Sequence, residues 1–93
     1  MLAATTIVRN GVGLHARPAA SLVREAQKYS CRITLEASGK RANGKSVIEI
    51  LALGVRCGQE VRVCAEGEGE EKAVGGIVSL IAALAAEEQQ DRQ

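Results

Sequence analysis

The segment RITLEASGKRANGKSVIEILALG, residues 32–54, predicts two strands, a turn and a helix in succession. Apolar residues alternate with polar ones at its start, which is the period of a half-buried strand; they are Ile33, Leu35 and Ala37. Ser38-Gly39-Lys40 predicts a turn into a second short strand that ends near Asn43-Gly44. Ser46-Val47-Ile48-Glu49 fits a capping box, so a short helix is expected to begin at Ser46 and to stop at Gly54.

The chain before this segment predicts one strand and one helix. Ile7 and Val8 indicate a short first strand, and Asn10-Gly11-Val12-Gly13 is typical of a turn. From Ala16 onward apolar residues recur at helical spacing; they are Ala19, Ala20, Val23 and Ala26. Pro18 falls in the first turn of this helix, where a missing N–H costs nothing.

The chain after the segment predicts a further strand and a last helix. Val61, Val63 and Ala65 alternate along the strand, and Gly67-Glu68-Gly69 ends it. The helix is marked by apolar residues at helical spacing, namely Val74, Ile77, Ile81 and Leu84. The polar residues 87–93 are expected to fray. The order β-α-β-β-α-β-α predicts an α+β fold with the helices gathered on one face of the sheet.

Length and composition restrict the classes of function. The 93 residues predict a single domain, residues 1–93. The 12 basic residues nearly balance the 11 acidic ones, and Tyr29 is the only aromatic residue, so a nucleic-acid partner is not expected. The apolar stretches fall short of the roughly 20 residues that a membrane span needs. The first residues lack the basic and apolar regions of a signal peptide.

Three cysteines, Cys31, Cys57 and Cys64, are odd in number and lack C-x-x-C spacing. They predict reduced thiols in a cytoplasmic protein, with neither a disulfide framework nor a structural zinc site. No metal or other cofactor is expected.

His15, the only histidine, directly precedes the predicted helix that starts at Ala16. The positive end of a helix favours an anion, and a neutral imidazole nitrogen is a nucleophile. Arg17 follows closely enough for its guanidinium to reach phosphate oxygens on His15. These features predict a phosphoryl-accepting histidine. The alternative is a plain ligand-binding α+β domain in which His15 and Arg17 only form a solvated helix start; neither a metal site nor a hydrolytic triad can be assembled from neighbouring residues.

The stretch Gly13-Leu14-His15-Ala16-Arg17-Pro18-Ala19 resembles the active-centre signature of HPr, the phosphocarrier family of the phosphoenolpyruvate-dependent sugar phosphotransferase system. A second signature, around the regulatory serine of that family, is matched by Asn43-Gly44-Lys45-Ser46-Val47 and by Leu53-Gly54-Val55. The similarity extends from about Thr6 to Leu84. It implies an open-faced β-sandwich whose four-stranded antiparallel sheet, of order 1-4-2-3, is covered on one face by three helices.

The resemblance also implies a function. His15 would accept a phosphoryl group from enzyme I on Nδ1 and pass it to a sugar-specific IIA domain, while Arg17 stabilises the charge in transfer. Such a chain is a carrier and not an enzyme, and we expect a monomer. The alternative within the same fold is a regulatory HPr-like module of a nitrogen-related phosphotransfer branch, whose phosphorylation state is read by partner proteins.

Ser46 has two interpretations. Relatives are phosphorylated at this serine by an ATP-dependent HPr kinase/phosphorylase, which implies a regulatory site, whereas the capping box alone also explains the residue. In the helix that follows, Ile50 and Leu53 are expected to face the sheet. Partner docking is expected at Ala16, Ala20, Arg24, Val47, Ile48, Leu51 and Arg56. Val12, Ile48 and Glu49 differ from the residues common in relatives, which bears on partner choice.

Overall fold

The computed structural model describes the backbone of residues 1–91 and the side chains of residues 1–87. Strands and helices follow one another in the predicted order. Their bounds are β1 (Leu2–Ile7), α1 (Ala16–Ala26), β2 (Arg32–Ala37), β3 (Lys40–Asn43), α2 (Val47–Leu53), β4 (Glu60–Glu66) and α3 (Glu70–Asp91).

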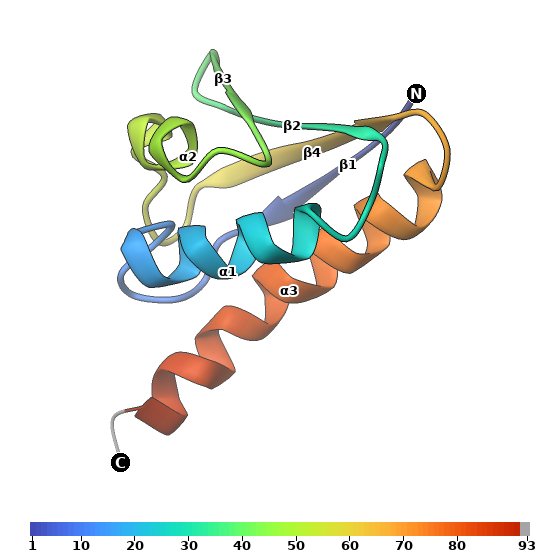
Figure 1. The fold of residues 1–93 in the computed structure, drawn as a ribbon. Helices are drawn as coiled ribbons and strands as arrows, with labels where there is room; N and C mark the ends of the chain where they lie inside the picture. The colour runs from blue at the N-terminus through green and yellow to red at the C-terminus, as the bar shows by residue number, and fades with distance from the viewer. Residues whose placement is uncertain (92–93) are drawn as a thin grey trace.

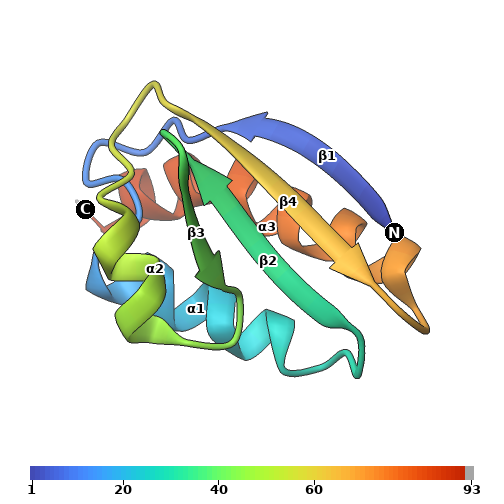
Figure 2. The ribbon, with the colours of Figure 1, turned by 90° about the horizontal axis from the view of Figure 1, so that it is seen from above.

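The strands form one antiparallel sheet of order β1-β4-β2-β3, with β4 and β2 in its centre. Val63 of β4 pairs with Ala4 on one side and with Leu35 on the other. Figures 1 and 2 show α1 and α3 side by side beneath one face of this sheet, with α2 at the edge formed by β3. Within residues 1–91 no helix covers the other face, which confirms the predicted open-faced sandwich.

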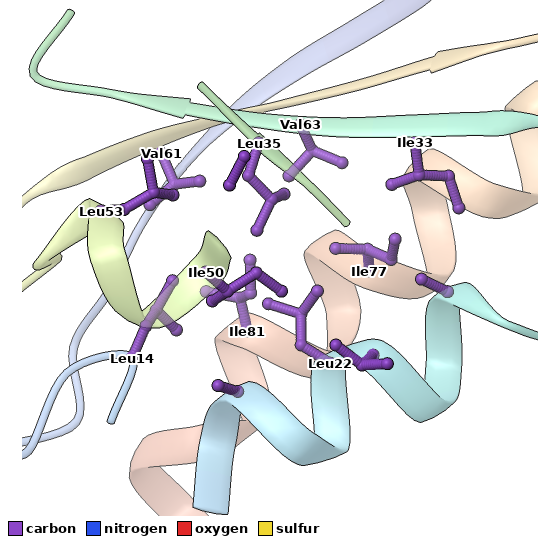
Figure 3. Close-up of a cluster of buried hydrophobic side chains, with 14 of the residues drawn as sticks. Leu14, Leu22, Ile33, Leu35, Ile50, Leu53, Val61, Val63, Ile77 and Ile81 are labelled. Atoms are coloured by element: carbon purple, nitrogen blue, oxygen red, sulfur yellow. The ribbon is translucent and has the colours of Figure 1, made fainter. Parts of the chain in front are cut away.

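The hydrophobic core lies between the sheet and the helices (Figure 3). Each helix contributes fully buried side chains, namely Leu22 from α1, Ile50 from α2, and Ile77 and Ile81 from α3. They pack against buried residues of β2 and β4, namely Ile33, Leu35, Val61 and Val63. Burying one such side chain stabilises a fold by about 1.5–3 kcal/mol. The alternating pattern of β2 and the helical pattern of α3 therefore identified their core faces correctly.

Two predicted boundaries are wrong. The first strand spans Leu2–Ile7 and ends before Val8, because β4 pairs with this poorly alternating segment along its whole length. The last helix continues to Asp91, although fraying was expected from residue 87. Four alanines at positions 82, 83, 85 and 86 precede this end, and alanine has the highest helix propensity. Residues 92–93 of the predicted tail lie outside the described residues.

Tyr29 joins the end of α1 to the connection between β3 and α2. Its hydroxyl donates a hydrogen bond to Glu25 Oε2 (2.7 Å), and its carbonyl accepts one from Lys45 Nζ (2.6 Å). Lys28 Nζ lies 3.0 Å from the other oxygen of Glu25. The bond to the Glu25 carboxylate raises the pKa of Tyr29, and the same bond lowers the pKa of Glu25.

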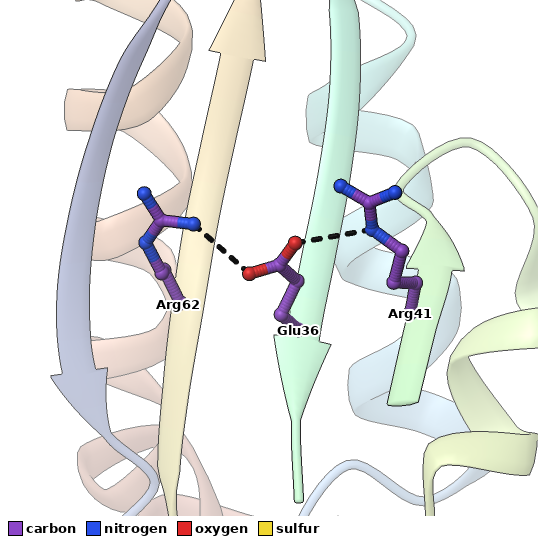
Figure 4. Close-up of polar contacts among 3 residues, drawn as sticks. All are labelled: Glu36, Arg41 and Arg62. Atoms are coloured by element: carbon purple, nitrogen blue, oxygen red, sulfur yellow. Dashed lines mark hydrogen bonds and ion pairs between the residues drawn. The ribbon is translucent and has the colours of Figure 1, made fainter. Parts of the chain in front are cut away.

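Glu36 binds two arginines on the open face of the sheet (Figure 4). Its carboxylate oxygens lie 3.0 Å from Arg62 of β4 and 3.1 Å from Arg41 of β3. The bonds from Arg62 and then from Arg41 lower the pKa of Glu36. This arrangement connects three neighbouring strands through side chains.

We expect Glu36→Gln to lower the free energy of unfolding at neutral pH and to leave it almost unchanged in acid. A carboxyl group whose folded pKa is depressed stabilises the fold above its ordinary value of 4.5, and that contribution is lost as the pH falls through the folded pKa. Urea unfolding at neutral and acidic pH measures the difference. Glu68→Gln is the control, because Glu68 is exposed and forms no ion pair within residues 1–87. An equal effect of Glu36→Gln at both pH values would show that the ionised Glu36 carboxylate does not stabilise the fold.

Candidate functional site

His15 is the N-cap residue of α1, with an extended backbone (φ −81°, ψ −169°). Its side chain is exposed and makes no capping hydrogen bond, while its carbonyl accepts the first helical bond from Ala19 N–H (2.8 Å). The first turn of α1 contains no acidic residue. No residue of the first turn therefore neutralises the positive end of the helix, and that end favours an anion.

The loop before His15 is a turn closed by Asn10. The Asn10 carbonyl accepts the Gly13 N–H (3.1 Å), and the Asn10 side-chain amide donates to the Gly13 carbonyl (2.8 Å). Asn10 is only 1% exposed, and its Oδ1 has no hydrogen-bond partner within the described part of the chain. Gly13 has a φ of +65°, a left-handed conformation that glycine adopts without steric cost. The buried amide and the glycine together fix the approach to His15.

Residues 8–14, which we call the His15 loop, are bonded to residues 55–59, the loop between α2 and β4. Both connections lie side by side in Figures 1 and 2. The bonds run from Leu14 N to Val55 O (3.1 Å), from Val8 N to Gln59 O (3.0 Å), from Gly58 N to Val8 O (2.6 Å) and from Cys57 Sγ to Arg9 O (3.5 Å). The position of His15 therefore depends on a segment about 40 residues further along the chain.

Arg17 and Arg24 are both exposed on α1. Arg17 lies in the first turn, two residues after His15, and Arg24 lies in the last turn and donates to Ser21 Oγ (3.3 Å). The predicted pair of His15 and Arg17 is thus brought to one helix end. An exposed imidazole at a helix N-terminus, with an arginine in the first turn, can hold a phosphoryl group.

Ser46 caps α2 as predicted, and its Oγ accepts the Glu49 N–H at 3.3 Å. The second half of the capping box differs from the usual pattern, because the Glu49 carboxylate accepts the N–H of Asn43 (2.9 Å) and not that of Ser46. Ser46 N–H donates instead to the Asn43 carbonyl (3.0 Å). Glu49 therefore connects the start of α2 to the end of β3 by a hydrogen bond. At the other end of the helix, Gly54 is the C-cap residue and has the left-handed conformation (φ 65°).

The expected docking residues differ in exposure. Ile50 and Leu53 face the core as predicted, while Ile48 is 80% exposed and Leu51 is 39% exposed. Val47 and Ala20 are half-buried, whereas Ala16 and Arg56 are exposed. Val12 was not among the expected docking residues, although its side chain is 59% exposed in the His15 loop. The sequence could have indicated this exposure, because Val12 is an apolar residue between two glycines of a predicted turn.

In the part of the chain that the structure describes, the cysteines and the acidic residues form no metal site. Cys31 and Cys64 are buried, Cys57 is exposed, and all three are free thiols. Within the described residues, no group of three or more histidine, cysteine or acidic side chains is placed to bind a metal ion. In the same part of the chain, no helix has the length and apolar character needed to cross a membrane.

A family model described as "PTS HPr component phosphorylation site" matches residues 2–83. The chain belongs to the HPr family. It is similar to the phosphocarrier protein HPr of Borreliella burgdorferi, with 40% identity over 87% of this chain and 94% of the relative. The structure of HPr-C-His from Thermoanaerobacter tengcongensis matches with a TM-score of 0.88 and 42% identity, over 92% of this chain and 97% of that one. An HPr dimer from the same organism matches with a TM-score of 0.72 and 42% identity, over 91% and 98% of the two chains.

Membership of the HPr family defines the general role of the chain. HPr proteins are phosphocarriers of the phosphotransferase system and not catalytic enzymes. The match includes both His15 and Ser46, since it covers residues 2–83. The α+β architecture and the strand order are those that the resemblance implied.

Proposed function

We propose that this chain carries a phosphoryl group on His15, which it accepts from enzyme I and passes to sugar-specific IIA domains. The observation that carries the proposal is the exposed His15 at the N-cap of α1, with Arg17 in the first turn and no acid there. An acidic residue at that position would repel the phosphoryl oxygens. We further propose that residues 1–93 act as one unit, as a monomer in the cytoplasm.

For this transfer the protein needs mainly to position the imidazole of His15 and to stabilise the negative charge of the phosphoryl group. The lone pair of Nδ1 of His15 attacks phosphorus while the bond from phosphorus to the donor breaks, and the donor keeps that electron pair. The guanidinium of Arg17 and the N-terminal end of α1 stabilise the negative charge on the phosphoryl oxygens. The reverse sequence of bond changes delivers the group to the next acceptor.

Docking to both partners would use the surface around α2 and the exposed face of α1. Ile48 and Leu51 supply exposed apolar area, and Arg24 and Arg56 supply positive charge at its margin. Ala16, Ala20 and Val47 complete this surface. A small interface of this kind gives weak and rapidly reversible binding, which suits a carrier that must release each partner.

Labelled phosphoenolpyruvate and enzyme I test the carrier function directly. We expect an acid-labile label on the chain that passes onward to a sugar-specific IIA domain. Labelling without onward transfer to any sugar-specific IIA domain would favour the regulatory branch. Absence of label would contradict the carrier proposal.

We propose that Ser46 is also a regulatory site, and substitutions separate this role from capping. Ser46→Asp keeps a capping acceptor but adds a negative charge beside Val47 and Ile48, so stability should change little while transfer from enzyme I slows. Ser46→Ala should cost about 0.5–2 kcal/mol of stability and leave transfer nearly normal. Thermal melts and steady-state transfer rates measure both effects. Wild-type transfer by Ser46→Asp would leave Ser46 with the capping role alone.

A further inference from the structure

The two bonded loops around His15 carry positive charge only. Residues 8–17 and 53–59, which comprise these two loops and the adjoining ends of α1 and α2, contain Arg9, Arg17 and Arg56 and no aspartate or glutamate. The whole chain, in contrast, has 12 basic and 11 acidic residues. Within these two segments the charge is therefore positive only, and Arg9 and Arg56 add to the charge of Arg17.

Arg56 is held close to the loop that leads to His15. A Cβ atom on Gly13 would lie 2.9 Å from Arg56 Cα, and Gly13 precedes His15 by two residues. The adjacent residues are joined directly, because Leu14 N–H donates to the Val55 carbonyl at 3.1 Å. The backbone of Arg56 is itself fixed, since its N–H donates to Gln59 Oε1 (2.6 Å) and its carbonyl accepts the Gln59 N–H (3.1 Å).

The guanidinium of Arg56 is available for an incoming anion. The side chain is exposed, and no carboxylate within residues 1–87 pairs with it. Arg41 and Arg62, by comparison, are both bound to Glu36 on the open face of the sheet. A guanidinium on a fixed backbone loses less conformational freedom when it binds phosphate oxygens than one on a mobile loop.

We propose that Arg56 is a second arginine, besides Arg17, that contacts the phosphoryl group on His15. This inference rests on the proposed role of His15. The Arg56 guanidinium donates hydrogen bonds to the non-bridging phosphoryl oxygens as the group arrives, and these charge-assisted bonds retain it after transfer. Arg56 was expected only as a docking residue, so the proposal gives it a contact with the reacting group itself.

An assay with phosphoramidate tests the contact between Arg56 and the phosphoryl group independently of partner docking. Phosphoramidate phosphorylates histidine directly, without a protein donor. The bond between phosphorus and nitrogen in phosphoramidate breaks, ammonia leaves, and phosphorus bonds to the imidazole nitrogen. His15 is the only histidine, so all phosphohistidine formed reports on this site. The variants are Arg56→Gln and Arg56→Lys. Arg32→Gln is the matched control, since Arg32 is likewise exposed but lies on β2 and takes part in no ion pair within residues 1–87.

We expect Arg56→Gln to lower the second-order rate of phosphoramidate labelling by about threefold to tenfold at low salt, with a smaller difference at high salt. Arg56→Lys should lie between wild type and Arg56→Gln, because it keeps the charge and loses the planar pair of donors. Arg32→Gln should label at the wild-type rate, and all variants should melt like the wild type.

Three results would overturn the inference. The first is an unchanged phosphoramidate rate in Arg56→Gln with a raised KM for enzyme I, which would leave Arg56 with docking alone. The second is an equal loss of rate in Arg32→Gln, which would show an effect of net charge only. The third is a wild type that phosphoramidate does not label on His15. If enzyme I fails to label the wild type while the phosphoramidate rate still depends on Arg56, the carrier proposal fails and the inference stands.

Discussion

Replacement of His15 by alanine should abolish acid-labile phosphorylation by enzyme I and leave the fold intact. The label is lost because no other imidazole is present in the sequence. Stability is retained because the His15 side chain is exposed and makes no capping hydrogen bond. Labelled phosphoenolpyruvate measures the first effect, and a thermal melt measures the second.

Gln27→Ala provides the control for this experiment. Gln27 is exposed at the opposite end of α1, as the residue that caps its C-terminus. We expect this variant to be labelled as fully as the wild type. Wild-type labelling of His15→Ala would exclude His15 as the acceptor.

Gly13→Ala should have the second largest effect, on stability and on transfer together. A non-glycine residue at a φ of +65° costs about 1–2 kcal/mol. The added Cβ would also overlap the Val55 carbonyl oxygen, which accepts the Leu14 N–H. The two loops must separate to relieve this overlap, so we expect a total loss of about 2–4 kcal/mol. Urea unfolding measures it, and the displaced His15 should accept phosphate more slowly.

Gly54→Ala is a matched control for the contribution of backbone conformation. Gly54 has the same φ of +65°, but a Cβ there would meet no atom within 4 Å. We expect this variant to lose only about 1–2 kcal/mol, the cost of the left-handed conformation. An equal loss in both variants would show that the contact between Gly13 and Val55 does not hold the two loops together.

Local patterns predicted those elements whose side chains carry their own signal. Ser46 and Gly54 mark both ends of α2, because capping and a left-handed terminus need particular residue types. The alternation of Ile33, Leu35 and Ala37 likewise identified the buried face of β2. The pair of His15 and Arg17 was also predictable, since both lie within one helix turn of each other.

Features that depend on distant parts of the chain were not predictable in this way. β1 begins at Leu2 because β4 pairs with it, and its own sequence shows no alternation. The bond from Cys57 to Arg9 joins residues 48 positions apart, so no local pattern indicates it. The closeness of Arg56 to the His15 loop follows from the same long-range contacts. The sequence therefore indicated His15 as the proposed acceptor and left part of its surroundings undetermined.

The isolation of Tyr29 also makes the protein convenient for fluorescence measurements. It is the only aromatic residue in the chain, and it is half-buried with its hydroxyl bonded to Glu25. Tyrosine emission therefore reports on one place, the junction between α1 and β2, when the protein unfolds. Because the chain has no tryptophan, light absorbed only by indole excites a tryptophan-containing partner alone. Any change in that emission on mixing then belongs to the partner, and binding can be titrated with both proteins unlabelled.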